Sequence, residues 1–271
     1  MAKVISAAEA AALIGDGMTV AVDGFIGFSL AEDILCEMEE RFLREGHPRD
    51  LRLGGDGRRR GINHFAHRGM LSRLLCSNLS LANAIYPHIS AGDFALFMAP
   101  QGVMSHMMRA IAGKKPGVLT SVGLRTFVDP RRDGCRMNQK AWESGEEVVQ
   151  LVELAGQEQL FFPAFPLDAC IIKGSTADAD GNISMEKEAF LLEQYEMAAA
   201  AHNSGGLVLA QVDQLVPAHT MNAKDVVVPG CLVDYIVVGR EENSRQQFVT
   251  EERWVEAFTG RVRIPLEGLP P

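Results

Sequence analysis

The sequence has few of the features that mark secreted or membrane-spanning proteins. Its five cysteines are an odd number, and the closest two, Cys135 and Cys170, lie 35 residues apart. This usage indicates neither a disulfide framework nor a CxxC metal or redox pair. Residues 1–14 lack a basic segment followed by an apolar core, and no run of about 18 apolar residues could span a membrane. We therefore expect a soluble, cytoplasmic protein with reduced thiols.

Positive charge is also scarce. The 271 residues carry a formal net charge of −9, with a pI near 5.3. Binding to a nucleic-acid backbone normally depends on clustered Lys and Arg, so a nucleic-acid partner is not expected. Hydrophobic residues make up 47% of the chain, which is enough to bury the core of one large α/β domain.

Signature motifs for nucleotide binding or hydrolysis are absent. The segment GFIGFS from Gly24 does not fit GxGxxG, and neither GxxxxGK[ST] nor GxSxG occurs. His64 and His67 could share a helix face, but no third ligand lies nearby in the sequence. Surface or capping histidines are therefore favoured over a metal site, and no metal is predicted.

Apolar strand-like runs alternate with helical patterns along the first half. MTVAVDGF from Met18 reads as a strand, and Ser29 with Glu32 forms a capping-box pattern that predicts a helix start. Further strands are expected at Asp50, Phe94 and Gly117, with a helix over about residues 102–112. This alternation predicts an α/β fold with an open, mainly parallel sheet flanked by helices.

The middle of the chain has a different pattern. Residues 146–165 contain two strand-like runs around Ala155 and Gly156, which predict a small side hairpin or subsidiary sheet. The alternation then returns, with a strand in LDACIIKGS from Leu167. Ser184 is expected to cap a helix whose first turn holds Glu186 and Glu188.

Glycines and one glutamine mark the ends of the predicted strands. In FALFMAPQG, Gln101 follows an apolar strand, at the edge where open α/β sheets bind ligands. Taken alone, Gln101 is interpreted more simply as a residue that satisfies turn backbone. The glycines that follow apolar strands allow a bulky ligand to approach, although tight turns explain any one of them; they are Gly24, Gly27, Gly54, Gly55, Gly57, Gly102 and Gly123.

Five motifs in order resemble the first half of class I coenzyme A transferases. They are DGFIGF, RGINHFAHRGML, MAPQGVMSHMMRAIAGKKPGVLTSVGLRTFVDPR, KGSTADADGNISMEKEA and AAHNSGGLVLAQV. The resemblance extends from Val4 to about Gly268 and is greatest to the acyl-CoA:acetate and 3-ketoacid branch with fused halves. It implies a CoA-transferase α-type domain over residues 1–268, with residues 269–271 beginning a linker or tail.

The resemblance also implies roles for particular residues. Gln101 of the PQG segment would hold the acyl or acceptor carboxylate, beside Gly102. Gly24, Phe25 and Gly27 match a loop after the first strand, and Gly54 and Gly55 match a loop near the reacting centre. Gly123 and Arg125 lie in a segment near the expected pocket; relatives have a glycine at position 125, so this arginine could pair with a second carboxylate or face solvent.

The nucleophile that the resemblance implies is missing from its expected context. Family enzymes use a glutamate that attacks the acyl-CoA and becomes a glutamyl-CoA thioester, and it lies in a Glu-x-Gly context of the second half. Here Glu143, in WESG, is a poor match. We therefore expect no catalytic residue in this chain, a β subunit or C-terminal half as partner, and a higher oligomer.

The substrate and the reaction both stay open at this stage. No permanently bound cofactor is expected, because a coenzyme A thioester is itself a substrate, with a carboxylic acid as acceptor. LLCSNLSLAN from Leu74 departs from the family pattern, so the particular acids are undetermined. An acyl-CoA hydrolase subunit and a noncatalytic ligand-binding subunit are the alternatives.

Overall fold

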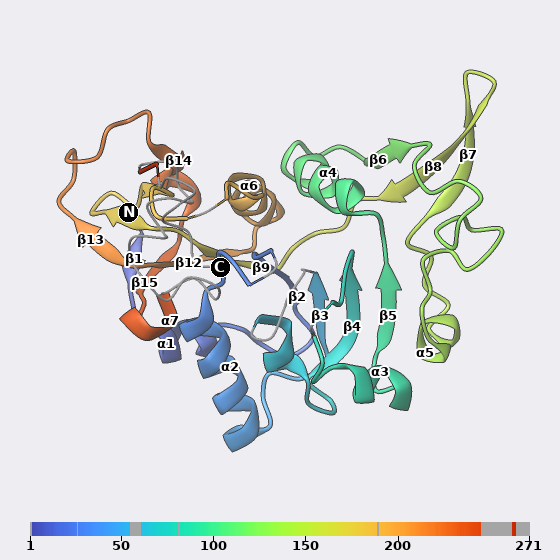
Figure 1. Ribbon diagram of the computed structural model, residues 1–271, viewed down its shortest axis with the longest axis horizontal. Helices are drawn as coiled ribbons and strands as arrows, with labels where there is room; N and C mark the ends of the chain where they lie inside the picture. Colours follow the sequence, from blue (N-terminus) through green and yellow to red (C-terminus); the bar gives the residue numbers. More distant parts are fainter. Residues whose placement is uncertain are drawn as a thin grey trace.

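The centre of the protein is one sheet of eight parallel strands (Figure 1). The computed structural model describes residues 2–25, 27–54, 61–80, 82–188, 190–244 and 262–263. The strand order is β1-β15-β12-β9-β2-β3-β4-β5. The strands are β1 (Lys3–Val4), β2 (Thr19–Val22), β3 (Leu51–Gly54), β4 (Leu71–Cys76), β5 (Ala95–Met98), β9 (Ala169–Lys173), β12 (Leu207–Val212) and β15 (Tyr235–Val238). The predicted open parallel sheet is confirmed.

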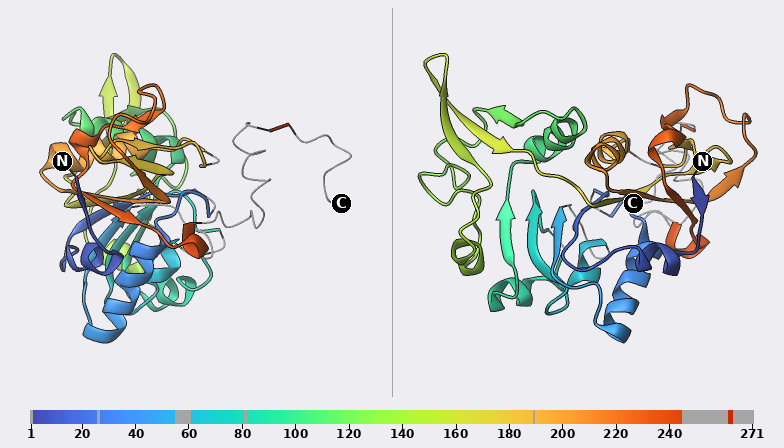
Figure 2. Two further views of the ribbon diagram at one scale, coloured as in Figure 1. Left: turned by 90° about the vertical axis from the view of Figure 1, so that its left-hand side faces the viewer. Right: turned by 180° about the vertical axis from the view of Figure 1, so that it is seen from behind.

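Helices cover both faces of this sheet (Figures 1 and 2). α4 (Gln101–Ala112) packs beside α6 (Gln194–Ser204) on one face, and α1 (Ala7–Ala12) packs beside α2 (Glu32–Glu45) on the other. The shorter helical segments are α3 (Tyr86–Ala91), α5 (Gln139–Glu143), α7 (Glu241–Ser244), η1 (Gly61–Phe65) and η2 (Gly230–Leu232). Among the helices placed here, none is long and apolar enough to cross a membrane.

Each face of the sheet has its own apolar core. Along β2, Val20 and Val22 join a cluster with Ile34 of α2, whereas Ala21 joins a second cluster with Met107 of α4. Successive side chains of a strand point to opposite faces, so both faces of β2 need apolar residues. This is why the buried strands read as continuous apolar runs in the sequence.

The order of the strands reverses beside β2. The strands β2 to β5 follow one another toward one edge, whereas β9, β12 and β15 follow one another toward the opposite side. The carboxyl ends of β2 and β9 therefore flank a topological switch point, the position at which open α/β sheets bind ligands.

Two smaller sheets complete the fold. β6 (Gly117–Thr120), β8 (Gln157–Pro163) and β7 (Gln150–Leu154) form an antiparallel sheet, which confirms the hairpin around Ala155 and Gly156. The prediction that β6 continues the parallel alternation is wrong, because a local pattern does not specify which distant strand will pair. The other sheet has the order β13-β10-β11-β14, with β13 (Gln214–Val216), β10 (Thr176–Asp178), β11 (Ile183–Ser184) and β14 (Val226–Val228).

The predicted cap at Ser29 is wrong. Ser29 has a φ of 54°, and its hydroxyl donates to Glu188 over 2.8 Å instead of capping a helix. The helix α2 begins at Glu32, after Ala31, without a side-chain cap. The Ser29 hydroxyl is therefore bound to the buried carboxylate of Glu188, which lies far along the chain, and is not available to cap the helix.

The predicted helix after Ser184 is also wrong. Ser184 ends β11, its hydroxyl donates to Glu186 over 2.5 Å, and the next helix, α6, begins only at Gln194. Lys173 binds Glu188 over 3.0 Å and Asp213 over 2.7 Å in the interior. Burial alone would lower the pKa of Lys173, but the two carboxylates outweigh burial and raise it. Glu188 is therefore held by a tertiary ion pair to Lys173 rather than in the first turn of a helix.

Candidate active site

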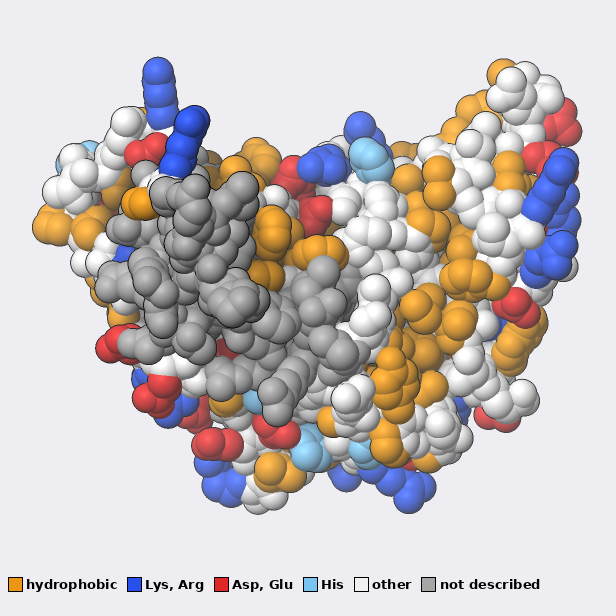
Figure 3. Space-filling model, viewed as in Figure 1, with side chains coloured by type: hydrophobic (Ala, Val, Ile, Leu, Met, Phe, Trp, Pro, Cys, Tyr) orange, Lys and Arg blue, Asp and Glu red, His pale blue; other side chains and the backbone are white. Residues whose placement is uncertain are grey.

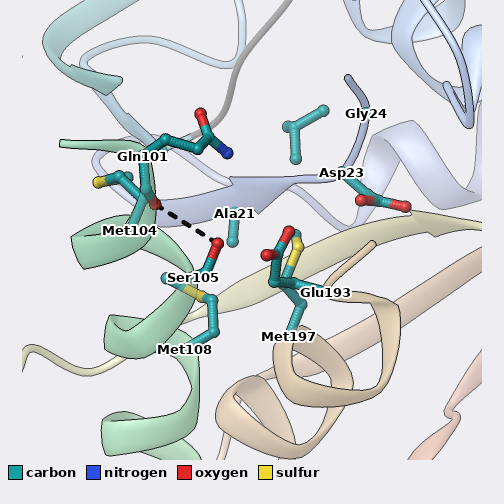
Figure 4. Close-up of a pocket in the computed structure, with 11 residues that line it drawn as sticks. Ala21, Asp23, Gly24, Gln101, Met104, Ser105, Met108, Glu193 and Met197 are labelled. Atoms are coloured by element: carbon teal, nitrogen blue, oxygen red, sulfur yellow. Dashed lines mark hydrogen bonds between the residues drawn. The ribbon is translucent and has the colours of Figure 1, made fainter. Parts of the chain in front are cut away.

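A small pocket opens at the switch point of the sheet. It is formed by β2 and the loop after it, the end of β3, and the starts of α4 and α6, and its volume is about 60 Å³. Its lining residues are Ala21, Val22, Asp23, Gly24, Gly54, Gln101, Met104, Ser105, Met108, Glu193 and Met197. Figure 4 shows Gln101 and Glu193 on opposite sides of Ala21. The pocket thus combines an apolar wall with a few polar groups, which is typical of ligand sites.

Gln101 supplies an amide to this pocket. It is the first residue of α4, directly after Pro100, which has an extended conformation. The Ser77 hydroxyl donates to Oε1 of Gln101, which orients the amide so that its nitrogen is directed into the pocket (Figure 4). An amide N–H can donate to a ligand oxygen without adding a charge that must be desolvated.

Gly24 is required where the chain leaves β2. Its φ is +133°, and a Cβ atom there would lie 2.2 Å from the side chain of Leu30. The backbone conformation strongly favours glycine, and a larger residue would also force the end of the Leu30 side chain to move. Gly24 therefore keeps the backbone close to the pocket without a side chain.

Asp23 is a buried carboxyl at the pocket wall. The residue is 4% exposed, and its Oδ2 has no hydrogen-bond partner among the residues the structure places. Burial, reinforced by the charge of Glu188 nearby, raises the pKa of Asp23 to about 8. At neutral pH this side chain is mainly the neutral acid, which can donate as well as accept a hydrogen bond.

Glu193 adds a second acidic group to the pocket. It lies directly before α6, it is partly buried, and Met197 one turn later belongs to the apolar wall. Glu143, the glutamate with a Glu-x-Gly context, is exposed at the end of α5 and does not line this pocket. Glu193 therefore shares the pocket with Gln101, whereas Glu143 does not.

The structure brings only some of the predicted site residues together. Gln101, Gly24 and Gly54 line the same pocket. Phe25 and Gly27 belong to the adjoining turn, in which the Phe25 ring packs edge-on against Phe190. Gly55 lies outside the residues that the structure describes.

Three other predicted residues lie outside this pocket. Gly102 faces a separate hollow between α4 and β6. Gly123 has a φ of +101°, and a Cβ atom there would lie 2.8 Å from the Val128 side chain. A glycine therefore suits the backbone conformation and the close packing of this turn. Arg125 is exposed beside Asp129 and Glu158, near the antiparallel β6-β8-β7 sheet.

Among the pocket residues that sequence reasoning missed are its two acidic side chains, Asp23 and Glu193. An acid directly after an apolar strand and before a glycine was a usable signal for Asp23, because it lies at the carboxyl edge of the sheet. Glu193 had no such signal, since it follows no predicted strand. Its position depends on where α6 begins.

The fold and the pocket define an α/β protein with a small pocket at the carboxyl edge of a parallel sheet, where such folds bind ligands. The chain belongs to the coenzyme A transferase family, whose model, described as Coenzyme A transferase, matches residues 4–239. This confirms the resemblance found in the sequence.

Similar proteins include chains about twice as long as this one and a separate alpha subunit. The chain is 40% identical over 276 residues to a caffeate CoA-transferase of Acetobacterium woodii, covering 100% of this chain and 52% of that protein. The apoenzyme crystal structure of the acyl-CoA transferase YdiF of Escherichia coli O157:H7 has a TM-score of 0.89 and 29% identity, over 98% of this chain and 52% of the other. The acetate CoA-transferase subunit alpha of Escherichia coli K12 is 24% identical, over 88% of this chain and 98% of that subunit. The chain thus spans about half the length of the first two proteins and nearly all of an α subunit.

The position of Arg125 gives a first prediction. Because its side chain lies outside the pocket of Gln101, we expect Arg125→Gly to leave the preference between monocarboxylic and dicarboxylic acceptors unchanged. The measurement is the ratio of kcat/KM values for two such acids, with the partner half present. A shift toward monocarboxylic acids would instead place this guanidinium at the substrate.

Proposed function

We propose that this chain is the α-type half of a CoA-transferase that moves CoA from a short-chain acyl-CoA to a carboxylic acid acceptor. A β subunit or C-terminal half supplies the nucleophilic glutamate, and no resident cofactor is needed. The observation that carries the proposal is the meeting of Gln101, Gly24 and Gly54 at one small pocket at the switch point. The family to which the chain belongs supports the class of reaction.

The size of the pocket supports a shared active site. Its volume of about 60 Å³ suits a carboxylate or an acyl group, whereas pockets for larger ligands typically have about 300–1,000 Å³. An acyl-CoA would therefore need walls that this pocket does not supply. A second half that covers the opening would provide them.

Exposed apolar side chains also support a partner. Figure 3 shows hydrophobic side chains gathered over β5 and toward the β7–β8 hairpin. Exposed large side chains in the segments around these strands include Tyr86, Leu119, Val122, Phe127, Met137 and Trp142. Extensive apolar surface of this kind commonly marks an interface.

The proposed chemistry uses the pocket for orientation. A glutamate carboxylate of the β half attacks the acyl carbonyl and expels CoA as the thiolate, which leaves an acyl-glutamyl anhydride. The thiolate then attacks the glutamyl carbonyl, which releases the acyl group as a carboxylate and leaves a glutamyl-CoA thioester; the acceptor acid reverses both steps. In each half-reaction, the Gln101 amide donates a hydrogen bond to a carboxylate oxygen of the acid that is released or bound.

Gln101→Ala tests this role. Loss of one or two hydrogen bonds to a bound carboxylate should lower kcat/KM about tenfold to a hundredfold, with little change in the free energy of unfolding. The matched control is Gln214→Ala, on an exposed glutamine of β13 that lies away from β5 and the β7–β8 hairpin (Figure 1) and does not line the pocket. This variant should retain full activity. If the Gln101→Ala enzyme and the unaltered enzyme had the same kinetics with several acceptor acids, Gln101 would be only a turn residue.

One assay distinguishes the reaction classes. With the β half present, acyl-CoA consumption should require an acceptor acid and yield the acceptor's CoA thioester. Consumption without any acceptor would indicate a hydrolase. Ligand binding without consumption under either condition would indicate a binding subunit.

A further inference from the structure

A cluster of side chains that can bind a metal lies beside α2. Glu32, Cys36 and Glu39 have the spacing i, i+4 and i+7, so they lie on one face of this helix. His64 of η1 and His67 just after it contact this face. The His64 side chain is 14% exposed, so it is largely covered by these contacts.

We propose that Glu32, Cys36 and His64 form a binding site for a divalent cation of the zinc class. One oxygen of Glu32, the sulfur of Cys36 and a ring nitrogen of His64 lie within 4.8 Å of one another. A set of one oxygen, one sulfur and one nitrogen donor favours Zn²⁺ over Mg²⁺ or Ca²⁺, which prefer oxygen alone.

The distances fit a tetrahedral ion. Nε2 of His64 lies 3.0 Å from Oε2 of Glu32 and 3.8 Å from Sγ of Cys36. The usual zinc bond lengths place a nitrogen about 3.4 Å from an oxygen ligand and about 3.6 Å from a sulfur ligand. Shifts of a few tenths of an ångström would bring these two separations to coordinating values, and the fourth position of a tetrahedral ion would be open to water.

The groups behind these ligands are also arranged for metal binding. Nδ1 of His64 lies 2.5 Å from Glu39, whose other oxygen lies 2.7 Å from Nε2 of His67. A carboxylate on the second ring nitrogen is the usual support for a histidine that ligates zinc. The backbone N–H of Gly61 donates to the other oxygen of Glu32 over 2.8 Å, which orients that carboxylate.

A purely ionic network is the competing interpretation. Burial lowers the pKa of His64, but its hydrogen bonds to Cys36 and Glu32 and the charge of Glu32 outweigh burial and raise it to about 11. Without a metal, His64 is thus an imidazolium ion between carboxylates. Zinc would replace the proton on Nε2 and that on the Cys36 thiol. Only the metal site requires the thiolate, so Cys36 distinguishes the two interpretations.

The position of the site suggests what the metal would stabilise. Leu30 lies two residues before the start of α2. Its side chain packs so closely against Gly24 and against Gly61, the first residue of η1, that a Cβ atom at either glycine would contact it. The ion would join α2, the helix after β2, to η1, the helical turn before β4. Gly24, just after β2, and Gly54, the last residue of β3, line the pocket.

Metal titration of the full chain tests the proposal. After chelator treatment, we expect about one Zn²⁺ to bind per chain, and Co²⁺ to give a thiolate-to-cobalt charge-transfer band with the visible spectrum of a four-coordinate ion. Cys36→Ser should abolish that band and weaken Zn²⁺ binding at least about tenfold. Glu39→Gln should weaken it about 10- to 100-fold, as expected for a residue that supports a ligand.

Cys231→Ser is the matched control, because Cys231 is exposed and lies on η2, outside the cluster. It should retain both the charge-transfer band and the Zn²⁺ affinity. Failure of the unaltered chain to bind Zn²⁺ stoichiometrically would overturn the proposal. Persistence of the band in Cys36→Ser would overturn it as well, and this conservative change keeps a hydroxyl at the position, so that folding is retained.

Discussion

The 271-residue chain alone is expected to show no CoA transfer, and addition of a β half with a Glu-x-Gly nucleophile should restore it. The physical reason is that the pocket holds the Gln101 amide and apolar side chains but encloses only about 60 Å³. The thioester, its CoA moiety and the attacking carboxylate need the surface of a second half. Rates should be measured for the chain alone, for the β half alone and for the mixture.

Trapping during turnover locates the nucleophile. Borohydride or hydroxylamine, added with acyl-CoA, should modify a glutamate of the β half, which peptide mass analysis would show. A modified glutamate within this chain, together with activity of the chain alone, would contradict the proposal. Glu193 would then be the first residue to substitute, since it lines the pocket whereas Glu143 does not.

Asp23→Asn should stabilise the protein, and the gain should grow with pH. The folded-state pKa of Asp23 is raised to about 8, while an unfolded aspartate ionises near pH 4. Between these values the unfolded chain has lost this proton and the folded chain keeps it, so the original protein loses stability as pH rises. The asparagine variant does not lose stability in this way. The difference between the two proteins in the free energy of unfolding should therefore grow by about 1.4 kcal/mol per pH unit.

Urea unfolding from about pH 5.5 to about pH 7.5 should therefore show an added gain of about 2.7 kcal/mol for Asp23→Asn. Above about pH 8 the Asp23 carboxyl is also ionised in the folded protein, so the gain in stability should level off. Asp133→Asn is the control, because Asp133 is exposed and its substitution should give no comparable trend. A gain that does not change with pH would mean that Asp23 is already ionised in the folded state.

Much of the fold could be predicted because its signals are local. The apolar runs of β2, β5, β9 and β12 are buried on both faces, and this burial alone favours a parallel sheet. Gln101, Gly24 and Gly54 were marked by their positions at or just after strand ends, at the edge where such sheets bind ligands. Their roles in a site followed only from the resemblance to the family.

Other features could not be predicted because their partners are distant in the sequence. Ser29 matches a helix cap, yet it donates to Glu188, 159 residues away. Glu188 matches the first turn of a helix, yet it pairs with buried Lys173. A local pattern cannot weigh such contacts, because the cost of leaving a buried charge unpaired outweighs the smaller gain from a helix cap.

The sequence by itself determined the strand alternation, the β7–β8 hairpin and the coenzyme A transferase family, because ordered motifs and periodic burial are written along the chain. Only the tertiary structure decided which of the marked residues share a pocket, that Arg125 lies outside it, and that Cys36 of α2 meets His64 of η1. The physical reason is that chain folding sets these proximities: 28 residues separate Cys36 from His64, and the packing of η1 against α2 places their sulfur and nitrogen 3.8 Å apart.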